Sequence, residues 1–397
     1  MQFRSAFPVA VLLGGAIGVA AVGAGIPRSI VRIDPDQPRS AFLVSDAMGA
    51  AAPVRWDIPV MNDASVDRFV RMFSGSKSDE FALYLKRSGR YEGMIRRKLR
   101  ERGMPEDLVY LSMIESGFNV TAKSRAQAVG LWQFMAGTAR GYGLRVDSYV
   151  DERKDPEKAT DAALRYLRDL HDQFGAWYLA AAAYNTGDGR VTRAMRAELG
   201  RSRGKESDYW RIRHRLPRET REYVPLMLAA AKIGKEPHKY GMGDVERWLP
   251  VRTETVDVPP ETHLAVVAEA VGVEESDLTR LNPHLVKKMT PPGKKPFPVR
   301  VPEGRAGAFA GNFETARAAH AEVARVEATR EAETRAAERR AEARRVASSR
   351  HVHRVRNGES LWTIARRHDT TVRAIQRANN LGSKSRIRPG QRLVIPS

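Results

Sequence analysis

A single glutamate stands where an apolar helical segment gives way to a turn. The stretch SMIESGFNVTAKSRAQAVGLWQF covers residues 112–134, and Glu115 is its only acidic residue. Pro105 suits the first turn of a helix and Gly117 suits its end, so we expect a helix between them. Glu115 then lies on the same apolar face as Leu111, near the negative end of the helix. Burial and the helix dipole both raise the pKa of a carboxyl group there, which suits general acid catalysis near neutral pH.

An isolated helical glutamate can equally well form an ion pair with a nearby arginine, and for Glu115 alone this alternative stays open. Two further segments favour a catalytic site. The segment GLWQF carries Gln133 beside aromatic residues, and the segment AAAYNTGDG ends an Ala-rich helix in Tyr184 and Asn185. Amides, hydroxyls and flat aromatic faces gathered at helix ends are typical of a cleft that binds sugars.

The elements that must position these residues are mainly helical. A helical pattern with basic faces runs from about residue 66 to 102, continues through the segments above, and ends near residue 235. Near Val251 the pattern changes to short β-branched runs with proline. A chain of 397 residues exceeds one typical domain, so we expect two or three folded units joined by linkers.

An internal repeat follows the helical region. When Leu264 is aligned with Leu361, Asn282 also aligns with Asn379, at an offset of 97 residues without a gap. Each copy has the pattern strand, helix, helix, strand over about 45 residues. We therefore expect two small βααβ modules.

The segment between the two copies is rich in Ala, Glu and Arg. From Phe313 to Arg350 it contains neither Leu nor Ile. High helix propensity without an apolar stripe predicts a solvated helical spacer. A coiled-coil dimer is the competing interpretation, which the missing apolar seam disfavours.

The N-terminus has the layout of a secretory signal. A basic start at Arg4 precedes an apolar run and the small residues that end at Ala24. We expect cleavage after about Ala24 and an exported protein in the periplasm or cell envelope; an uncleaved membrane anchor stays open as the alternative. No later segment is apolar enough to span a membrane.

The charge and the cysteine content exclude several classes of function. The formal net charge is +20, and residues 350–397 carry eleven Lys and Arg against two acidic residues, a net +9. Such a module could bind nucleic acid, but export favours an anionic polymer of the cell envelope. There is no cysteine, and the nine histidines show no ligand spacing such as HExxH, so we expect neither a metal nor another cofactor.

Four motifs together resemble a known enzyme family. ESGFN, AVGLWQFMAGTARGYGL, AAAYNTGDGRV and RETREYVPLMLAA match, in order and spacing, the motifs of soluble-lytic-transglycosylase-type domains, which have a goose-lysozyme-like fold. The C-terminal repeat HRVRNGESLWTIARRHDTTVRAIQRANNLGSKSRIRPGQRLVIP resembles LysM, a peptidoglycan-binding module. The first copy is a degenerate LysM-like module, because it lacks the usual Gly-[Asp/Glu]-[Ser/Thr]-Leu motif before its first helix. With its leader and repeats, the chain is most similar to the membrane-bound murein lytic transglycosylases.

The sequence patterns and the resemblance together give an expected range for each part. Residues 1–24 are the signal peptide, 25–65 a leader, 66–245 the catalytic domain, 253–302 the degenerate LysM-like module, 303–350 the charged helical linker and 351–397 the LysM module. The expected fold class is mainly α, with small βααβ modules. Members of this family are often lipoproteins, and the missing N-terminal cysteine means that this mode of anchoring does not carry over.

The resemblance also implies a role for each site residue. Glu115 matches the single catalytic acid, which protonates the glycosidic oxygen between N-acetylmuramic acid and N-acetylglucosamine. As a carboxylate it then takes the proton of the muramoyl 6-hydroxyl, and a 1,6-anhydro end forms. The substrate-binding positions matched are Ser124, Gln133, Tyr184, Asn185 and Tyr223.

Core packing stays open as an alternative for several aromatic residues. For Trp132 and Phe134 it is as good an interpretation as sugar stacking, and for Tyr223 it is a serious rival to a place in the cleft. Trp362 of the last repeat is expected in the core or in a shallow groove wall.

Three functions from different classes follow. The first is a peptidoglycan lytic transglycosylase, the second a hydrolytic muramidase on the same fold, and the third a non-catalytic wall-binding scaffold. Hydrolytic glycosidases need a second carboxylate. Between Ile114 and Arg145 the chain offers none besides Glu115, although a distant one could fold back. The expected partners are peptidoglycan glycan strands and other cell-wall proteins, without nucleic acid, and with a membrane only through an uncleaved N-terminal segment.

Overall fold

The computed structural model describes residues 54–348, 351–383 and 386–396. The chain forms two units, which we describe separately. The first extends to Phe313 and the second begins at Glu314. The predicted signal peptide and most of the predicted leader lie outside the described residues.

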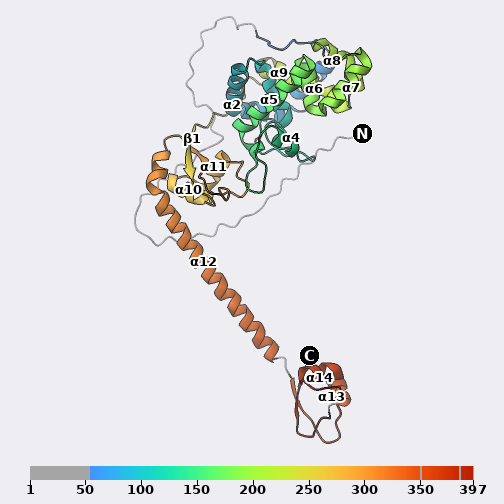
Figure 1. Ribbon diagram of the computed structural model, residues 1–397, viewed down its shortest axis with the longest axis vertical. Helices are drawn as coiled ribbons and strands as arrows, with labels where there is room; N and C mark the ends of the chain where they lie inside the picture. Colours follow the sequence, from blue (N-terminus) through green and yellow to red (C-terminus); the bar gives the residue numbers. More distant parts are fainter. Residues whose placement is uncertain (1–53, 349–350, 384–385, 397) are drawn as a thin grey trace. The chain divides into compact units, whose positions relative to one another are not determined.

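The first unit begins with a helical domain (Figure 1). Its α-helices are α1 Ala64–Ser74, α2 Ser78–Glu101, α3 Val109–Ser116, α4 Ala136–Gly141, α5 Pro156–Phe174, α6 Trp177–Thr186, α7 Asp188–Leu199, α8 Glu206–Ile212 and α9 Arg218–Lys235. Short 3-10 helices lie at Glu106–Leu108, Glu152–Lys154, Arg213–Arg215 and Pro237–Tyr240. The expected mainly helical fold is confirmed.

Helices α6 and α9 lie at the centre of this domain. Helix α9 packs against α1, α3 and α6, and α6 also packs against α5 and α7. Ala180–Ala183 of α6 are completely buried. Their small side chains allow neighbouring helices to approach closely, so that the two motifs at the ends of α3 and α6 and the one within α9 can meet.

Each copy of the repeat is a βααβ module. The first consists of β1 Thr253–Val258, α10 Leu264–Val271, α11 Glu275–Leu281 and β2 Phe297–Pro302. The second consists of β3 His351–Arg354, α13 Leu361–Arg367, α14 Val372–Ala378 and β4 Arg392–Ile395. In each module the two strands pair antiparallel.

The repeat has a physical basis in one asparagine of each copy. The side chain of Asn282 donates to the Leu278 carbonyl at 3.0 Å and to the Arg300 carbonyl at 2.8 Å. Asn379, at the equivalent position, donates to the Ile375 carbonyl at 2.8 Å and to the Val394 carbonyl at 2.7 Å. In both modules this amide bonds the end of the second helix to the last strand. This shared structural role explains why both copies have an asparagine at this position.

Helix α12, Ala306–Ser348, joins the modules and corrects one expectation about the linker. The prediction of a solvated spacer is wrong at its start. Phe313 is buried and its ring lies 4.8 Å from that of Phe309, while Asn312 donates to the Ala270 carbonyl of the first module. Two phenylalanines four residues apart form a short apolar face that a search for Leu and Ile does not detect.

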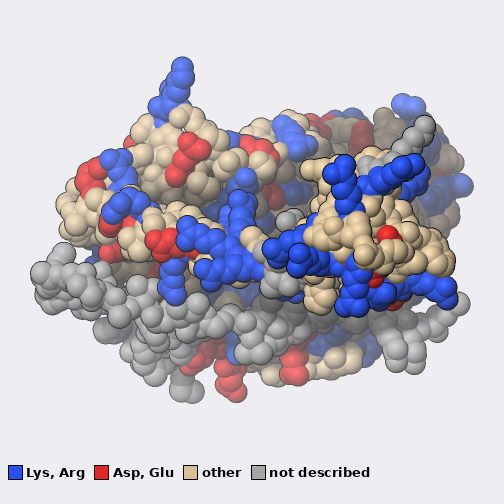
Figure 2. All heavy atoms as spheres, turned by 90° about the horizontal axis from the view of Figure 1, so that it is seen from below, with Lys and Arg blue, Asp and Glu red and all other residues tan. Residues whose placement is uncertain are grey.

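The described helices include none that is both long enough and apolar enough to cross a membrane. Figure 2 shows one face of the molecule, on which Lys and Arg side chains outnumber Asp and Glu. This agrees with the formal net charge of +20.

Candidate active site

Helix α3 carries Glu115 and ends as the sequence predicts. Gly117 is its C-cap, with a left-handed φ of 57°, and its N–H donates to the Met113 carbonyl. The Ser116 hydroxyl donates to the Leu131 carbonyl at 2.9 Å, which ties the end of α3 to the loop of the GLWQF motif. The catalytic candidate therefore lies where two motifs are joined.

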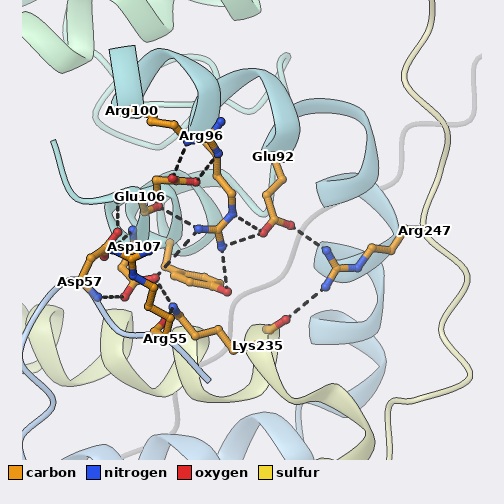
Figure 3. A network of polar contacts seen from close by, with 11 residues as sticks. Arg55, Asp57, Glu92, Arg96, Arg100, Glu106, Asp107, Lys235 and Arg247 are labelled. Atoms are coloured by element: carbon orange, nitrogen blue, oxygen red, sulfur yellow. Dashed lines mark hydrogen bonds and ion pairs between the residues drawn. The ribbon is translucent and has the colours of Figure 1, made fainter. Parts of the chain in front are cut away.

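A polar network fixes the start of the same helix (Figure 3). The carboxylate of Asp57 accepts from the backbone N–H groups of Glu106 at 2.6 Å and Asp107 at 3.1 Å. The carboxylate of Asp107 lies 2.5 Å from the Lys235 ammonium group at the end of α9. Arg96 of α2 donates to the Glu106 carbonyl at 3.2 Å. These contacts fix the segment before α3 against α2 and α9, and so hold the helix that carries Glu115 in place.

The Glu115 carboxylate is half-buried, and its direct side-chain partner among the described residues is Tyr223. The Tyr223 hydroxyl of α9 donates to Oε1 of Glu115 at 2.5 Å. Burial raises the pKa of Glu115 to about 7; the hydrogen bond from Tyr223 lowers it and the negative charge of Glu219 raises it. Glu115 therefore exchanges a proton near neutral pH, as a residue that acts first as an acid and then as a base requires.

Tyr184 lies close to the same carboxylate. Burial and the charge of Glu115 raise the Tyr184 pKa well above its usual value, so its hydroxyl stays protonated and can donate. It donates to the Trp132 carbonyl at 2.7 Å. The motif at the end of α6 is thus bonded to the GLWQF loop.

Trp132 and Phe134 belong to the core. Trp132 is 0% exposed and its indole N–H donates to the Thr160 hydroxyl at 3.0 Å, and Phe134 is 3% exposed. Core packing is therefore the correct interpretation for both. Tyr223 is also buried, at 6% exposed, yet its hydroxyl reaches Glu115, so packing and a place at the site are combined in one residue.

Asn185 takes part in a second network at the start of α9. Its amide donates to Glu219 at 3.2 Å, and its carbonyl oxygen accepts from the Thr220 hydroxyl at 2.8 Å. Asn185 is thereby held by α9, which also carries Tyr223.

Ser124 and Gln133 make contacts within their own loop. The Ser124 hydroxyl accepts from the Ala128 N–H at 3.0 Å. The Gln133 amide donates to the Gly130 carbonyl at 2.9 Å and to the Ala122 carbonyl at 3.3 Å. These bonds shape the loop after α3, and the substrate contacts predicted for both residues remain predictions.

Sequence reasoning missed Glu219. This exposed carboxylate acts on the pKa of Glu115 and contacts Asn185. It precedes Tyr223 by four residues, which places both on one face of α9, and this spacing could have revealed it.

Among the described residues, no group of three or more His, Asp or Glu side chains is arranged to hold a metal ion. The residues gathered around Glu115 can donate, accept and transfer protons.

Three segments of the chain match known families. Residues 93–206 match the family described as Transglycosylase SLT domain. Residues 252–318 match the LysM-like domain of lytic transglycosylase MltD, and residues 353–396 match the LysM domain.

Individual proteins are similar to parts of the chain. The chain is 34% identical over 304 residues to membrane-bound lytic murein transglycosylase D of Escherichia coli K12, an alignment that covers 75% of this chain and 61% of that relative. It is 31% identical over 160 residues to the soluble lytic murein transglycosylase of the same organism, covering 39% of this chain and 24% of the relative. The crystal structure of the 70-kDa soluble lytic transglycosylase of Escherichia coli matches with a TM-score of 0.31 and 27% identity, over 40% of this chain and 26% of that one.

Proposed function

With an SLT domain, an MltD-type LysM-like domain and a LysM domain in this order, the chain has the domain set of MltD-like proteins, and we propose that it is a peptidoglycan lytic transglycosylase. The proposed reaction cleaves the β-1,4 bond between N-acetylmuramic acid and N-acetylglucosamine. It leaves 1,6-anhydro-muramoyl ends and consumes no water. No cofactor is needed.

One observation carries this proposal. Glu115 is a half-buried carboxyl group with a pKa of about 7, held by the Tyr223 hydroxyl at 2.5 Å. In the protonated form Glu115 donates its proton to the glycosidic oxygen as the bond to the anomeric carbon breaks. The resulting carboxylate then takes the proton of the muramoyl 6-hydroxyl as that oxygen attacks the anomeric carbon. A pKa near the working pH serves both steps.

The remaining site residues are proposed to bind the sugar. Tyr184 stays protonated and helps to orient Glu115, and Asn185 holds the N-acetyl group, supported by its bonds to α9. Ser124 and Gln133 line the cleft on the loop after α3. The LysM module is proposed to bind glycan, and export by residues 1–24 would bring the enzyme to the periplasm, where other cell-wall proteins are candidate partners.

Glu219 favours a second candidate, a hydrolytic muramidase. It is a second carboxylate, its negative charge raises the pKa of Glu115, and hydrolytic glycosidases use a pair of carboxyl groups. Its exposure and its bond to Asn185 favour a supporting role instead.

The test is mass spectrometry of purified sacculi digested in ¹⁸O water by the full chain and by its Glu115→Gln and Glu219→Gln variants. We expect anhydro-muropeptides without ¹⁸O from the wild type and from Glu219→Gln, and a roughly thousandfold lower yield from Glu115→Gln. Reducing ends that carry ¹⁸O and disappear in Glu219→Gln would establish the muramidase. If none of the three proteins gave a product, the result would support the third function, a non-catalytic wall-binding scaffold.

A further inference from the structure

The first LysM-like module is fixed against the helical domain. Asp155, which is 1% exposed, caps the start of α5 and accepts from the Arg300 guanidinium of β2 at 2.7 and 2.9 Å. The backbone N–H of Val286 donates to the Tyr149 carbonyl at 2.8 Å. A buried ion pair and backbone hydrogen bonds hold the two surfaces in a defined geometry, so a site between them is preorganised.

A cavity of about 260 Å³ lies between these surfaces. Its walls come from α2, the start of α5, the connection at 250–253, α11 and β2. Val120, five residues after Glu115, also lines it, whereas none of the six predicted site residues does. Ligand clefts typically measure roughly 300–1,000 Å³, so this cavity suits one or two amino-acid residues better than a disaccharide.

The lining is basic and apolar together. Three arginines, Arg90, Arg280 and Arg300, line the cavity together with Glu157 and Asp277, and the other lining residues are mostly apolar. Arg280 is paired with Asp277, and Arg300 with Asp155. Nη1 of Arg300 is buried without a hydrogen-bond partner among the described residues. An arginine-rich, largely apolar cavity is suited to a carboxylate carried by a short peptide, because guanidinium pairs with carboxylate in a geometry that neutral groups do not match.

We propose that this cavity binds the carboxylate-bearing end of a short peptide, which on the proposed substrate is the peptide stem of a muramoyl residue. The inference rests on the proposed function, because a wall glycan brings such stems to the enzyme. The first module would then contribute to selecting peptide-bearing strands, although its LysM sequence is degenerate.

The test uses the full chain and a defined probe. Isothermal titration calorimetry measures the binding of the dipeptide L-alanyl-γ-D-glutamate and of its diamide, in which neutral amides replace both carboxylates. Val251→Trp places a large side chain in the cavity lining, and Leu249→Trp is the matched control, since both residues are similarly exposed at 38% and 40% but only Val251 lines the cavity. Arg90→Gln removes one guanidinium without adding bulk and carries the test if Val251→Trp does not fold.

We expect the dipeptide to bind the wild type and Leu249→Trp equally. Its Kd should rise at least tenfold in Val251→Trp and in Arg90→Gln, and the diamide should bind the wild type at least tenfold more weakly. The absence of saturable dipeptide binding, equal affinity for the diamide, or unchanged affinity in both cavity variants would overturn the proposal.

The binding readout separates this proposal from the proposed function. Anhydro-muropeptides produced without dipeptide binding would overturn the peptide site alone. Dipeptide binding with the expected variant pattern, but without anhydro products, would support the site and overturn the catalytic proposal.

Discussion

Tyr223 and Glu219 act on the same carboxyl group in opposite directions. The Tyr223 hydrogen bond lowers the pKa of Glu115 and the Glu219 charge raises it, against a background of burial that raises it to about 7. Both residues lie on α9, so a single helix carries the two groups that adjust the pKa of Glu115 about the value set by burial. The protonated form starts the reaction, so kcat/KM should fall as the pH rises through about 7.

Tyr223→Phe should shift this fall to higher pH. The variant removes a hydrogen bond that favours the carboxylate, so the pKa of Glu115 rises, by up to about one unit for a bond of ordinary strength. The measurement is the pH profile of kcat/KM on a soluble glycan. A profile identical to that of the wild type would show that this bond does not control Glu115.

Glu219→Gln should shift the fall to lower pH. Removing a negative charge lowers the pKa of Glu115, and we expect a few tenths of a unit because Glu219 is exposed and its field is screened. The same profile, repeated at low and high salt, checks this, with a smaller shift at high salt. A shift to higher pH, the direction expected for Tyr223→Phe, would contradict the inference that the charge of Glu219 raises the pKa of Glu115.

Glu115→Gln should stabilise the fold at alkaline pH. The pKa of Glu115 is raised from 4.5 to about 7 in the folded protein, so its stabilising contribution is fully present below 4.5 and is lost as the pH rises through about 7. The variant should therefore gain free energy of unfolding relative to the wild type between these values and keep that gain above them. Urea unfolding at pH 4 and pH 8 measures it, and an equal difference at both pH values would argue against a raised pKa.

At the scale of elements, the end of α3 depends on one glycine. A Cβ atom at Gly117 would lie 2.2 Å from the ring of Tyr84, in a backbone conformation with φ of +57°. Gly103 has nearly the same φ, +59°, but nothing lies within 4 Å of its Cβ position. An alanine at Gly103 would therefore meet backbone strain alone, whereas an alanine at Gly117 would meet backbone strain and an overlap with Tyr84.

Gly103→Ala should lower the free energy of unfolding by about 1 kcal/mol, from left-handed strain alone. Gly117→Ala should lower it by roughly 3 kcal/mol or more, because the Tyr84 ring must also move, and activity should fall with the displaced Glu115. Urea unfolding and turnover of a soluble glycan measure both. Equal effects of the two variants would show that the overlap is relieved without disturbing the site.

At the scale of the whole molecule, catalysis and wall attachment are assigned to different parts of the chain. The proposed acid lies in the helical domain, whereas residues 353–396 match LysM. Trp362 is 60% exposed, which corrects the expectation that it could belong to the core, and the Arg366 guanidinium lies 5.5 Å from its ring centroid. An exposed aromatic residue beside a cation is available for contact with a ligand.

Deleting residues 351–397 should weaken binding to sacculi much more than turnover of short soluble glycans. On this proposal the module raises the effective concentration of substrate, whereas the proposed acid Glu115 belongs to the helical domain. We expect at least a tenfold loss in a sacculus pull-down and a change of less than about twofold in kcat/KM on soluble glycan. Equal losses in both assays would contradict the proposal that residues 351–397 serve wall binding and not catalysis.

The sequence by itself determined the mainly helical class, the two βααβ modules and the end of α3 at Gly117. These features follow from local patterns: hydrophobic periodicity, a left-handed glycine and an asparagine repeated at the same position of each copy. The sequence also pointed to Glu115, because this acid at the end of an apolar helix stands in the first of four motifs that resemble a known enzyme family.

Only the tertiary structure decided which neighbours Glu115 has. Tyr223 lies 108 residues away along the chain, and its hydroxyl reaches Oε1 only because α9 packs against α3. Glu219, on the same helix α9, acts on the pKa of Glu115. Trp132 is buried in the core, where it donates to Thr160 of α5. The ion pair of Asp155 with Arg300 joins residues 145 positions apart, and Arg300 also lines the cavity beside the first module. Contacts between distant segments depend on how whole elements pack, and local sequence patterns carry no information about that geometry.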